Sequence, residues 1–234
     1  MIAREGLPLI SIGLAVTTVL AWGSLMWDNW WLLSLAALLS LLTFFTLFFF
    51  RDPPRPTHAD STQLLAPGDG RILSIETVRD HAYIGGDALK VSIFLSILDV
   101  HINRIPATGR IDFVRYNPGR FFPAFKDKAS ELNEHTEIGM TTDIGHRIVF
   151  KQIAGIIARR IVCKVQEGDA VVAGARFGMI RYGSRVELFV PVGSELLVKE
   201  GNHVKGGLTV LGFLPRISAV APAGVTAQEK NAEL

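Results

Sequence analysis

EGDAV at residues 167–171 returns as EGNHV at residues 200–204, and these two stretches decide the fold. In each, a glycine precedes a short segment that ends in valine, and a glycine-containing turn follows. Self-similarity of this kind indicates two related β-units that pack around one core. We therefore predict that the C-terminal part of the chain is built mainly from short β-strands.

Residues 165–212 around this repeat resemble the lipoyl/biotinyl carrier fold, including VPVG at 190–193 between the halves. Carrier domains display a modified lysine at a hairpin tip, roughly where this chain has YGSR at 182–185. The lysine is missing, which disfavours a membrane-tethered carrier domain and directs attention to Ser184. A membrane adaptor with a lipoyl-like unit is disfavoured as well, because residues 172–199 leave no room for its long helical hairpin.

After Pro56 the sequence consists of short apolar runs separated by glycine turns, which is typical of β-structure. We predict strands at 91–98 and 147–153 and a short helix at 156–161. The predicted class is α+β and mostly β, with a lipoyl/biotinyl-like barrel-sandwich domain at 56–217. A flexible polar tail is expected at 218–234.

Two apolar runs precede this domain, at 8–26 and 31–50, and Asp28 is the only charged residue from Pro8 to Phe50. Each run has close to the ~20 residues that a helix needs to cross a bilayer. Residues 1–55 are therefore predicted to form a membrane-anchoring helical hairpin, which either spans the bilayer or dips into one leaflet. Arginines flank the hairpin but are absent from its turn, so the positive-inside rule predicts that the domain at 56–217 lies on the cytoplasmic side of the cell membrane.

Composition excludes several other classes of protein. The net charge of +2 and the lack of an aromatic-basic RNA motif argue against nucleic acid as a partner. Cys163 is the single cysteine, which rules out an internal disulfide and a cysteine-based zinc cluster. The six histidines show no metal-ligand spacing, so no metal is expected.

The strongest motif is FGMIRYGSRVEL at 177–188. It closely resembles the processing site of phosphatidylserine decarboxylases, in the short form of that family. Further matching segments occur in the family's order: FFRDP at 49–53, APGDG at 66–70, DVHINRIP at 99–106 and KDKASE at 126–131. The resemblance covers most of residues 49–213.

This resemblance implies a pyruvoyl-dependent decarboxylase that cuts itself between Gly183 and Ser184 into fragments 1–183 and 184–234. Ser184 would become a pyruvoyl group, and no external cofactor is expected. A Schiff base at residue 184 would convert phosphatidylserine to phosphatidylethanolamine and carbon dioxide, although an archaeal-type serine lipid is an open alternative substrate. The two fragments would stay together as a heterodimer, and a further homodimer is also open.

The resemblance also assigns roles to individual residues. His101 would be the base for self-cleavage, and Asp69 would orient and polarise it, as the carboxylate does in a hydrolase triad. Longer family members carry a second histidine where this chain has Arg104, so His101 either serves both self-cleavage and decarboxylation or shares them with another group. Arg104, Arg110 and Lys126 are candidates to bind the lipid head group, but a solvated basic face explains them equally well.

Overall fold

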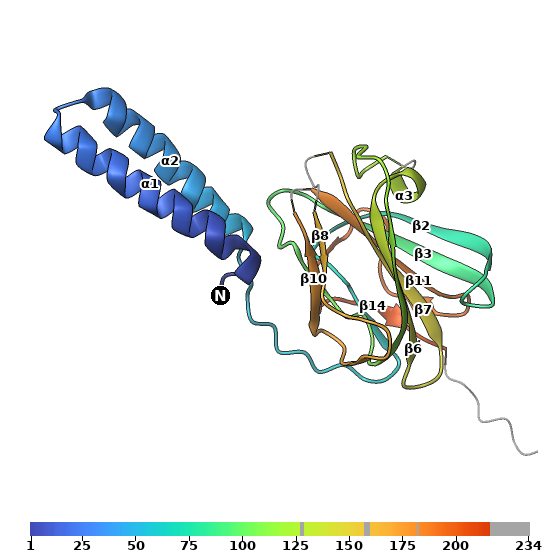
Figure 1. Cartoon of the computed structure of the whole chain (residues 1–234). Coiled ribbons are helices and arrows are strands. Elements are labelled where there is room, and N and C mark those ends of the chain that lie inside the picture. Colours follow the sequence, from blue (N-terminus) through green and yellow to red (C-terminus); the bar gives the residue numbers. More distant parts are fainter. Residues whose placement is uncertain (127–128, 157–159, 182, 216–234) are drawn as a thin grey trace, which may run out of the picture.

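The computed structural model describes residues 1–126, 129–156, 160–181 and 183–215. It has two parts, an apolar helical hairpin at the N-terminus and a β-domain (Figure 1). The hairpin projects away from the β-domain, and only its base touches the strands (Figure 1). The predicted class, mostly β behind an N-terminal helical hairpin, is confirmed.

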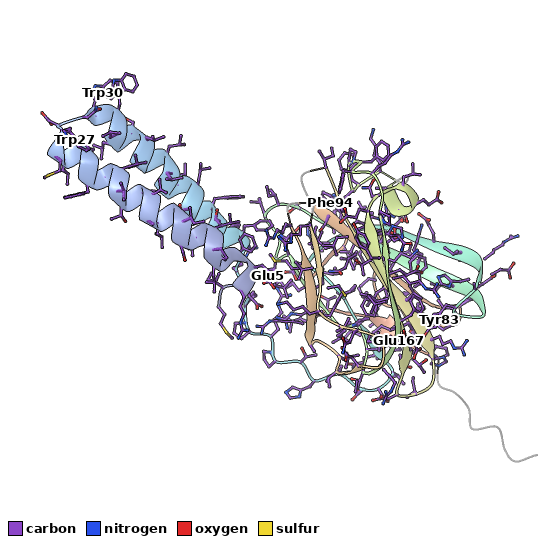
Figure 2. All side chains as sticks on the ribbon, in the orientation of Figure 1. Glu5, Trp27, Trp30, Tyr83, Phe94 and Glu167 are labelled. Atoms are coloured by element: carbon purple, nitrogen blue, oxygen red, sulfur yellow. The ribbon has the colours of Figure 1, made fainter. Side chains whose placement is uncertain are left out.

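The hairpin consists of α1 (Leu7–Met26) and α2 (Trp30–Phe49), preceded by the short 3-10 helix η1 (Arg4–Gly6). The Asn29 side chain caps α2 by accepting hydrogen bonds from the N–H groups of Trp31 and Leu32. Trp27 and Trp30 lie at the tip, far from the β-domain (Figure 2). Both helices are long and apolar enough to cross a membrane, and most of their side chains are exposed rather than packed in a protein core.

The β-domain contains one large sheet and two small ones. The eight-stranded sheet has the order β13-β2-β3-β11-β7-β6-β5-β9, and its strand pairs are antiparallel. Its strands are β2 (Gly70–His81), β3 (Gly86–Leu95), β5 (Gly109–Asn117), β6 (His135–Thr142), β7 (Arg147–Ile153), β9 (Ala170–Val171), β11 (Ser184–Pro191) and β13 (His203–Val204).

The small sheets have three strands each, in the orders β1-β14-β12 and β4-β10-β8. Their strands are β1 (Gln63–Leu65), β4 (Ile102–Arg104), β8 (Ile161–Cys163), β10 (Arg176–Ile180), β12 (Glu195–Leu196) and β14 (Val210–Phe213). The short helix α3 (Ala129–Leu132) lies between β5 and β6 in the chain.

The two repeated stretches form the outermost strands of the large sheet, β9 from the first and β13 from the second. The strand predicted at 147–153 is confirmed as β7, whereas the one predicted at 91–98 belongs to β3, which ends at Leu95. The predicted helix at 156–161 is wrong at its end, because Ile161 begins β8. Residues 157–159 and the predicted tail at 218–234 lie outside the described residues.

Strand β11 lies inside the large sheet, between β3 and β7. Its residues alternate between the two faces of the sheet. Val186, Leu188 and Val190 face the main hydrophobic core, in which they are completely buried. Ser184, at the start of the strand, shares their face by the same alternation.

A second apolar cluster joins the hairpin to the β-domain. Phe49 and Phe50, at the end of α2, are fully buried and pack with Val100, Ile102 and Met179. Arg51 donates hydrogen bonds to the carbonyl oxygens of Phe48 and Leu98. The base of the hairpin is therefore fixed against the loop that connects β3 to β4.

Candidate active site

Ser184 is the first residue of β11, where it pairs with Leu95 of β3. The residue is completely buried, and within the described part of the chain its Oγ atom has no hydrogen-bond partner. A buried hydroxyl without a partner carries a desolvation cost, and such groups in native proteins often serve chemistry. The structure therefore places the predicted nucleophile inside the protein, with its oxygen not bonded to any described residue.

The peptide bond before Ser184 is held in an unusual geometry. Gly183 has a φ of +69°, in the left-handed region that glycine adopts most readily. Its carbonyl oxygen lies so close to Gly155 that a Cβ added there would collide with that oxygen. Glycine at 155 thus leaves room for the Gly183 carbonyl, and glycine at 183 permits the positive φ of the residue before Ser184.

His101 precedes β4 and is completely buried. Its Nδ1 atom lies 2.9 Å from the main-chain oxygen of Asp99, and its Nε2 atom lies 3.3 Å from the main-chain nitrogen of Gly183. These contacts fit a neutral ring that donates from Nδ1 and accepts at Nε2. The lone pair of Nε2 is thereby directed at the residue that precedes the predicted cut.

Burial lowers the pKa of His101 from 6.5 to about 4, although the hydrogen bond with Asp99 and the charges of Asp99 and Asp69 raise it. Part of this burial comes from the Phe49 ring, whose centroid is 4.2 Å from that of the histidine ring. Water is excluded there, so the charged imidazolium is disfavoured. His101 is therefore neutral at physiological pH and can accept a proton.

Asp69 does not make the contact with His101 that the triad hypothesis expected. Its carboxylate instead forms a two-pronged ion pair with Arg55, at 2.5 and 2.8 Å, and accepts the N–H of Gly206. The orienting group of His101 is the carbonyl of Asp99. Asp69 reaches the histidine only through its charge, and its ion pair ties the linker after the hairpin to the β-domain.

Arg104 is buried, and its guanidinium bonds to the carbonyl oxygens of Gly174 and Pro53. It also lies 3.5 Å from Asp52. Arg104 thus joins the linker to the β-domain. The arrangement does not present Arg104 to a lipid head group.

Arg110 also lies away from Ser184, as the strand register shows. Across the sheet, Arg185 of β11 pairs with Ile153 of β7, which pairs with His135 of β6. His135 in turn pairs with Asn117 of β5. Arg110 is near the other end of β5, seven residues away, which at ~3.3 Å per residue is roughly 20 Å. Arg110 therefore lies at the opposite end of β5 from the row that begins beside Ser184.

Lys126, the third predicted head-group residue, has a more suitable position. It is exposed and follows Ala124 and Phe125 in the chain. Ala124 lies close to Gly155, because a Cβ added to Gly155 would be 3.4 Å from the Cβ of Ala124. Gly155 in turn supports the Gly183 carbonyl. Lys126 is thus the predicted basic residue whose loop borders the site.

Two amide side chains without a predicted role lie beside this site. Asn103 and Gln152 are completely buried, and Nε2 of Gln152 donates to Oδ1 of Asn103 at 2.8 Å. Gln152 pairs with Val186, which is two residues beyond Ser184. Among the described residues, Nδ2 of Asn103 and Oε1 of Gln152 lack partners, so one free donor and one free acceptor remain inside the protein.

On the opposite face of β11, a buried ion pair supports the strand. Arg185 and Glu187 are 2.8 Å apart, and Ser130 of α3 donates to both carboxylate oxygens of Glu187. Breaking such a pair by removing one partner is costly, because it leaves an uncompensated buried charge. The pair therefore fixes α3, from the predicted KDKASE motif, against the strand that begins with Ser184.

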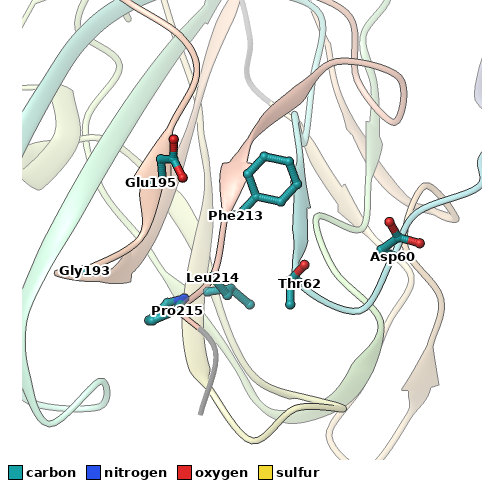
Figure 3. Close-up of a pocket in the computed structure, with 7 residues that line it drawn as sticks. All are labelled: Asp60, Thr62, Gly193, Glu195, Phe213, Leu214 and Pro215. Carbon is teal, nitrogen blue, oxygen red and sulfur yellow. The ribbon is translucent and has the colours of Figure 1, made fainter. Parts of the chain in front are cut away.

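Cavities elsewhere are separate from these residues. One of about 460 Å³ is lined by Asp60, Thr62, Gly193, Glu195, Phe213, Leu214 and Pro215, beyond the far end of β11 (Figure 3). Another, of about 350 Å³, opens at the hairpin base, where Lys164 pairs with Glu5 and Arg176 pairs with Asp52. Within the described ranges, no group of three or more His, Cys, Asp or Glu side chains is arranged to hold a metal ion.

Comparison with known proteins gives consistent matches over most of the chain. The family model described as phosphatidylserine decarboxylase matches residues 42–212. A phosphatidylserine decarboxylase proenzyme of Symbiobacterium thermophilum is 43% identical over 216 residues, which are 92% of this chain and 97% of that protein. A proenzyme of the same name from Desulfotalea psychrophila is 42% identical and covers 90% of this chain and 95% of its own.

The proenzyme of Salinibacter ruber has a higher identity, 49%, over a shorter range that covers 73% of this chain and 76% of that protein. The range matched by the family model includes the end of α2, His101, Gly155 and Ser184. It therefore contains both the hairpin base and the buried serine and histidine described above. The chain belongs to the phosphatidylserine decarboxylase family.

Proposed function

We propose that this chain cuts itself between Gly183 and Ser184 and then converts phosphatidylserine to phosphatidylethanolamine and carbon dioxide. The observation that carries the proposal is the buried Ser184 hydroxyl, which has no partner among the described residues and follows a scissile residue that contacts the neutral His101. The related proenzymes bear names consistent with a decarboxylase made as a precursor.

Self-cleavage would begin at the Ser184 hydroxyl. His101 accepts its proton while Oγ bonds to the Gly183 carbonyl carbon, the C–N bond breaks, and the amine of residue 184 gains a proton. This leaves an ester between Gly183 and Ser184. Removal of the Cα proton of residue 184 then expels the Gly183 carboxylate, and addition of water releases ammonia from the remaining dehydroalanine. A pyruvoyl group is left at the start of fragment 184–234.

The surroundings of Ser184 fit such a group. Its ketone would supply the electron sink that takes up the electron pair when the substrate carboxylate leaves as carbon dioxide. Asn103 and Gln152 would offer polar atoms without adding charge, and His101 would give or take protons beside the new carbonyl. Asp69 contributes to this proposal indirectly, through its charge and through Arg55.

The hairpin would hold the enzyme on the membrane that contains its substrate. Two helices of sufficient length and hydropathy, with most side chains exposed, favour insertion into a bilayer. Their base contacts His101 through Phe49, so the site lies close to the membrane surface. Arg4, Arg51 and Arg55 flank the hairpin, which favours the cytoplasmic side for the β-domain.

Intact-mass spectrometry of the detergent-purified full chain tests this function, together with release of carbon dioxide from vesicles of carboxyl-labelled phosphatidylserine. We expect fragments 1–183 and 184–234. The smaller fragment should be lighter by one ammonia than the same fragment with an intact serine at its N-terminus. Vesicles of phosphatidylcholine alone serve as the blank. A chain that remains whole while it releases carbon dioxide would contradict the self-processing mechanism.

The lowered pKa of His101 predicts an unusual pH dependence of self-cleavage. The base must be unprotonated, and a folded-state pKa of about 4 keeps it unprotonated well below the ordinary value of 6.5. The cleavage rate of precursor made by cell-free synthesis should therefore stay level as the pH falls through 6.5 and decline only towards 4. A cleavage rate that falls to half its maximum near pH 6.5 would show that the reacting histidine is solvated rather than buried.

A further inference from the structure

Four large apolar side chains are exposed around the bond between Gly183 and Ser184. They are Ile97, Leu98, Phe125 and Ile156, and we call them the apolar rim; their exposed fractions are 39%, 63%, 58% and 53%. They come from three separate segments: the loop between β3 and β4, the loop before α3, and the residue after Gly155. Single exposed apolar residues are ordinary, but a group around a reactive site needs an explanation.

The three segments converge on the scissile bond. The loop with Ile97 and Leu98 leads directly into His101, which contacts Gly183. Ile156 follows Gly155, which lies against the Gly183 carbonyl. The Phe125 ring packs edge-on against Phe94 of β3, which pairs with Arg185 at the start of β11. The rim residues therefore lie on segments that contact or adjoin the proposed active site.

The rim is also continuous with the base of the hairpin. Arg51, just after α2, donates a hydrogen bond to the carbonyl oxygen of Leu98, and its guanidinium lies 4.0 Å from the centre of the Phe48 ring. Leu98 is thus held beside the point where the apolar helix ends. The loop between β3 and β4 lies next to this end of α2, while Trp27 and Trp30 mark the distant tip (Figures 1 and 2).

Resting on the proposed function, we propose that the apolar rim inserts into the leaflet from which the hairpin emerges. The occupant of this surface is the lipid bilayer itself. The rim would place the site's entrance below the head groups, so that a phosphatidylserine molecule moves laterally from the leaflet to residue 184. Exposed Lys126 beside Phe125 would remain at head-group level, where a cation is favoured near anionic lipid.

Charged substitutions separate this role from stability and chemistry. The full chain with Leu98→Asp and Ile156→Asp is compared with a matched variant, Val192→Asp and Leu197→Asp, whose exposed side chains lie beyond the far end of β11. Each is assayed for self-cleavage, for turnover of a short-chain phosphatidylserine in detergent, and for turnover of long-chain phosphatidylserine in vesicles.

We expect the rim variant to cleave itself and to use the short-chain lipid normally, but to lose at least about tenfold in rate on vesicles, because carboxylates resist entering hydrocarbon. The matched variant should keep all three activities. A rim variant with an unchanged vesicle rate would overturn the proposal, as would an equal loss in the matched variant.

A second measurement requires no activity. Leu98→Cys in a Cys163→Ala background is labelled with an environment-sensitive dye, and the full chain is placed in vesicles with brominated acyl chains. Quenching of the dye at position 98, and its absence for a dye at position 192, is the expected result. An unquenched dye at 98, or one shielded by a second copy of the chain, overturns the insertion. If the wild-type chain fails to cleave itself, the proposed function fails, but this measurement still decides the position of the rim.

Discussion

Ser184→Ala should give a chain that stays whole at 25.6 kDa and releases no carbon dioxide from phosphatidylserine. Alanine lacks the oxygen that must first attack the Gly183 carbonyl and then leave, so neither the cut nor the pyruvoyl group can form. The expected loss is complete, because no neighbouring hydroxyl can take over a reaction at the backbone of residue 184. Gels of purified protein and the carbon dioxide assay measure the two effects separately.

Folding of this variant can be checked independently. Ser184 is completely buried and its Oγ has no partner within the described residues, so its removal should leave thermal stability nearly unchanged or slightly increased. Ser184→Cys is the matched control, because a thiol can attack and leave as well and should give slow, partial cleavage. Two fragments from Ser184→Ala would refute the assignment of the nucleophile.

Much of the fold could be predicted because its signals are local. The apolar runs of the hairpin are long enough to identify by length alone, and β7 was predicted at its observed bounds, Arg147–Ile153. The repeated stretches indicated two related units, which the structure places at opposite edges of one sheet. The position of Ser184 followed from a motif rather than from periodicity.

The contacts that the sequence could not reveal join distant segments. Asp69 pairs with Arg55 because the linker after the hairpin folds back along the β-domain, and no local pattern reveals this. Arg110 is close to His101 in sequence, but β5 carries it away from the end of the sheet where Ser184 lies. Closeness in the sequence therefore does not place Arg110 near Ser184 in space.

The sequence does contain a pattern that singles out Gln152. It shares a face of β7 with Ile148 and Phe150, so a polar residue occupies a position where the alternation requires an apolar one. A polar group at such a position must find a partner or serve a function. Its partner Asn103 is two residues beyond His101, and only the structure shows that the two amides meet.

His101→Ala should produce mostly uncut precursor. Comparing its cleavage with that of Asp69 variants shows whether Asp69 assists the histidine. Loss of a positioned general base typically slows a reaction by roughly 10²–10⁴-fold, so little cleavage is expected in the time in which the wild-type chain finishes. Because the histidine is completely buried against Phe49, its removal leaves a cavity. Added imidazole that restores cleavage would identify a missing base rather than a damaged fold.

The ion pair of Asp69 makes a sharper test than its substitution alone. If Asp69 acts by holding Arg55, then Asp69→Asn and Arg55→Gln should slow cleavage to a similar extent and lower thermal stability together. If its charge assists His101 directly, Asp69→Asn should slow cleavage much more than Arg55→Gln and should also shift the acidic limb of the pH profile. The 2.5 and 2.8 Å contacts with Arg55 favour the first result.

Normal cleavage in both His101→Ala and Asp69→Ala would show that neither residue takes part, and the proton of Ser184 would then need another acceptor.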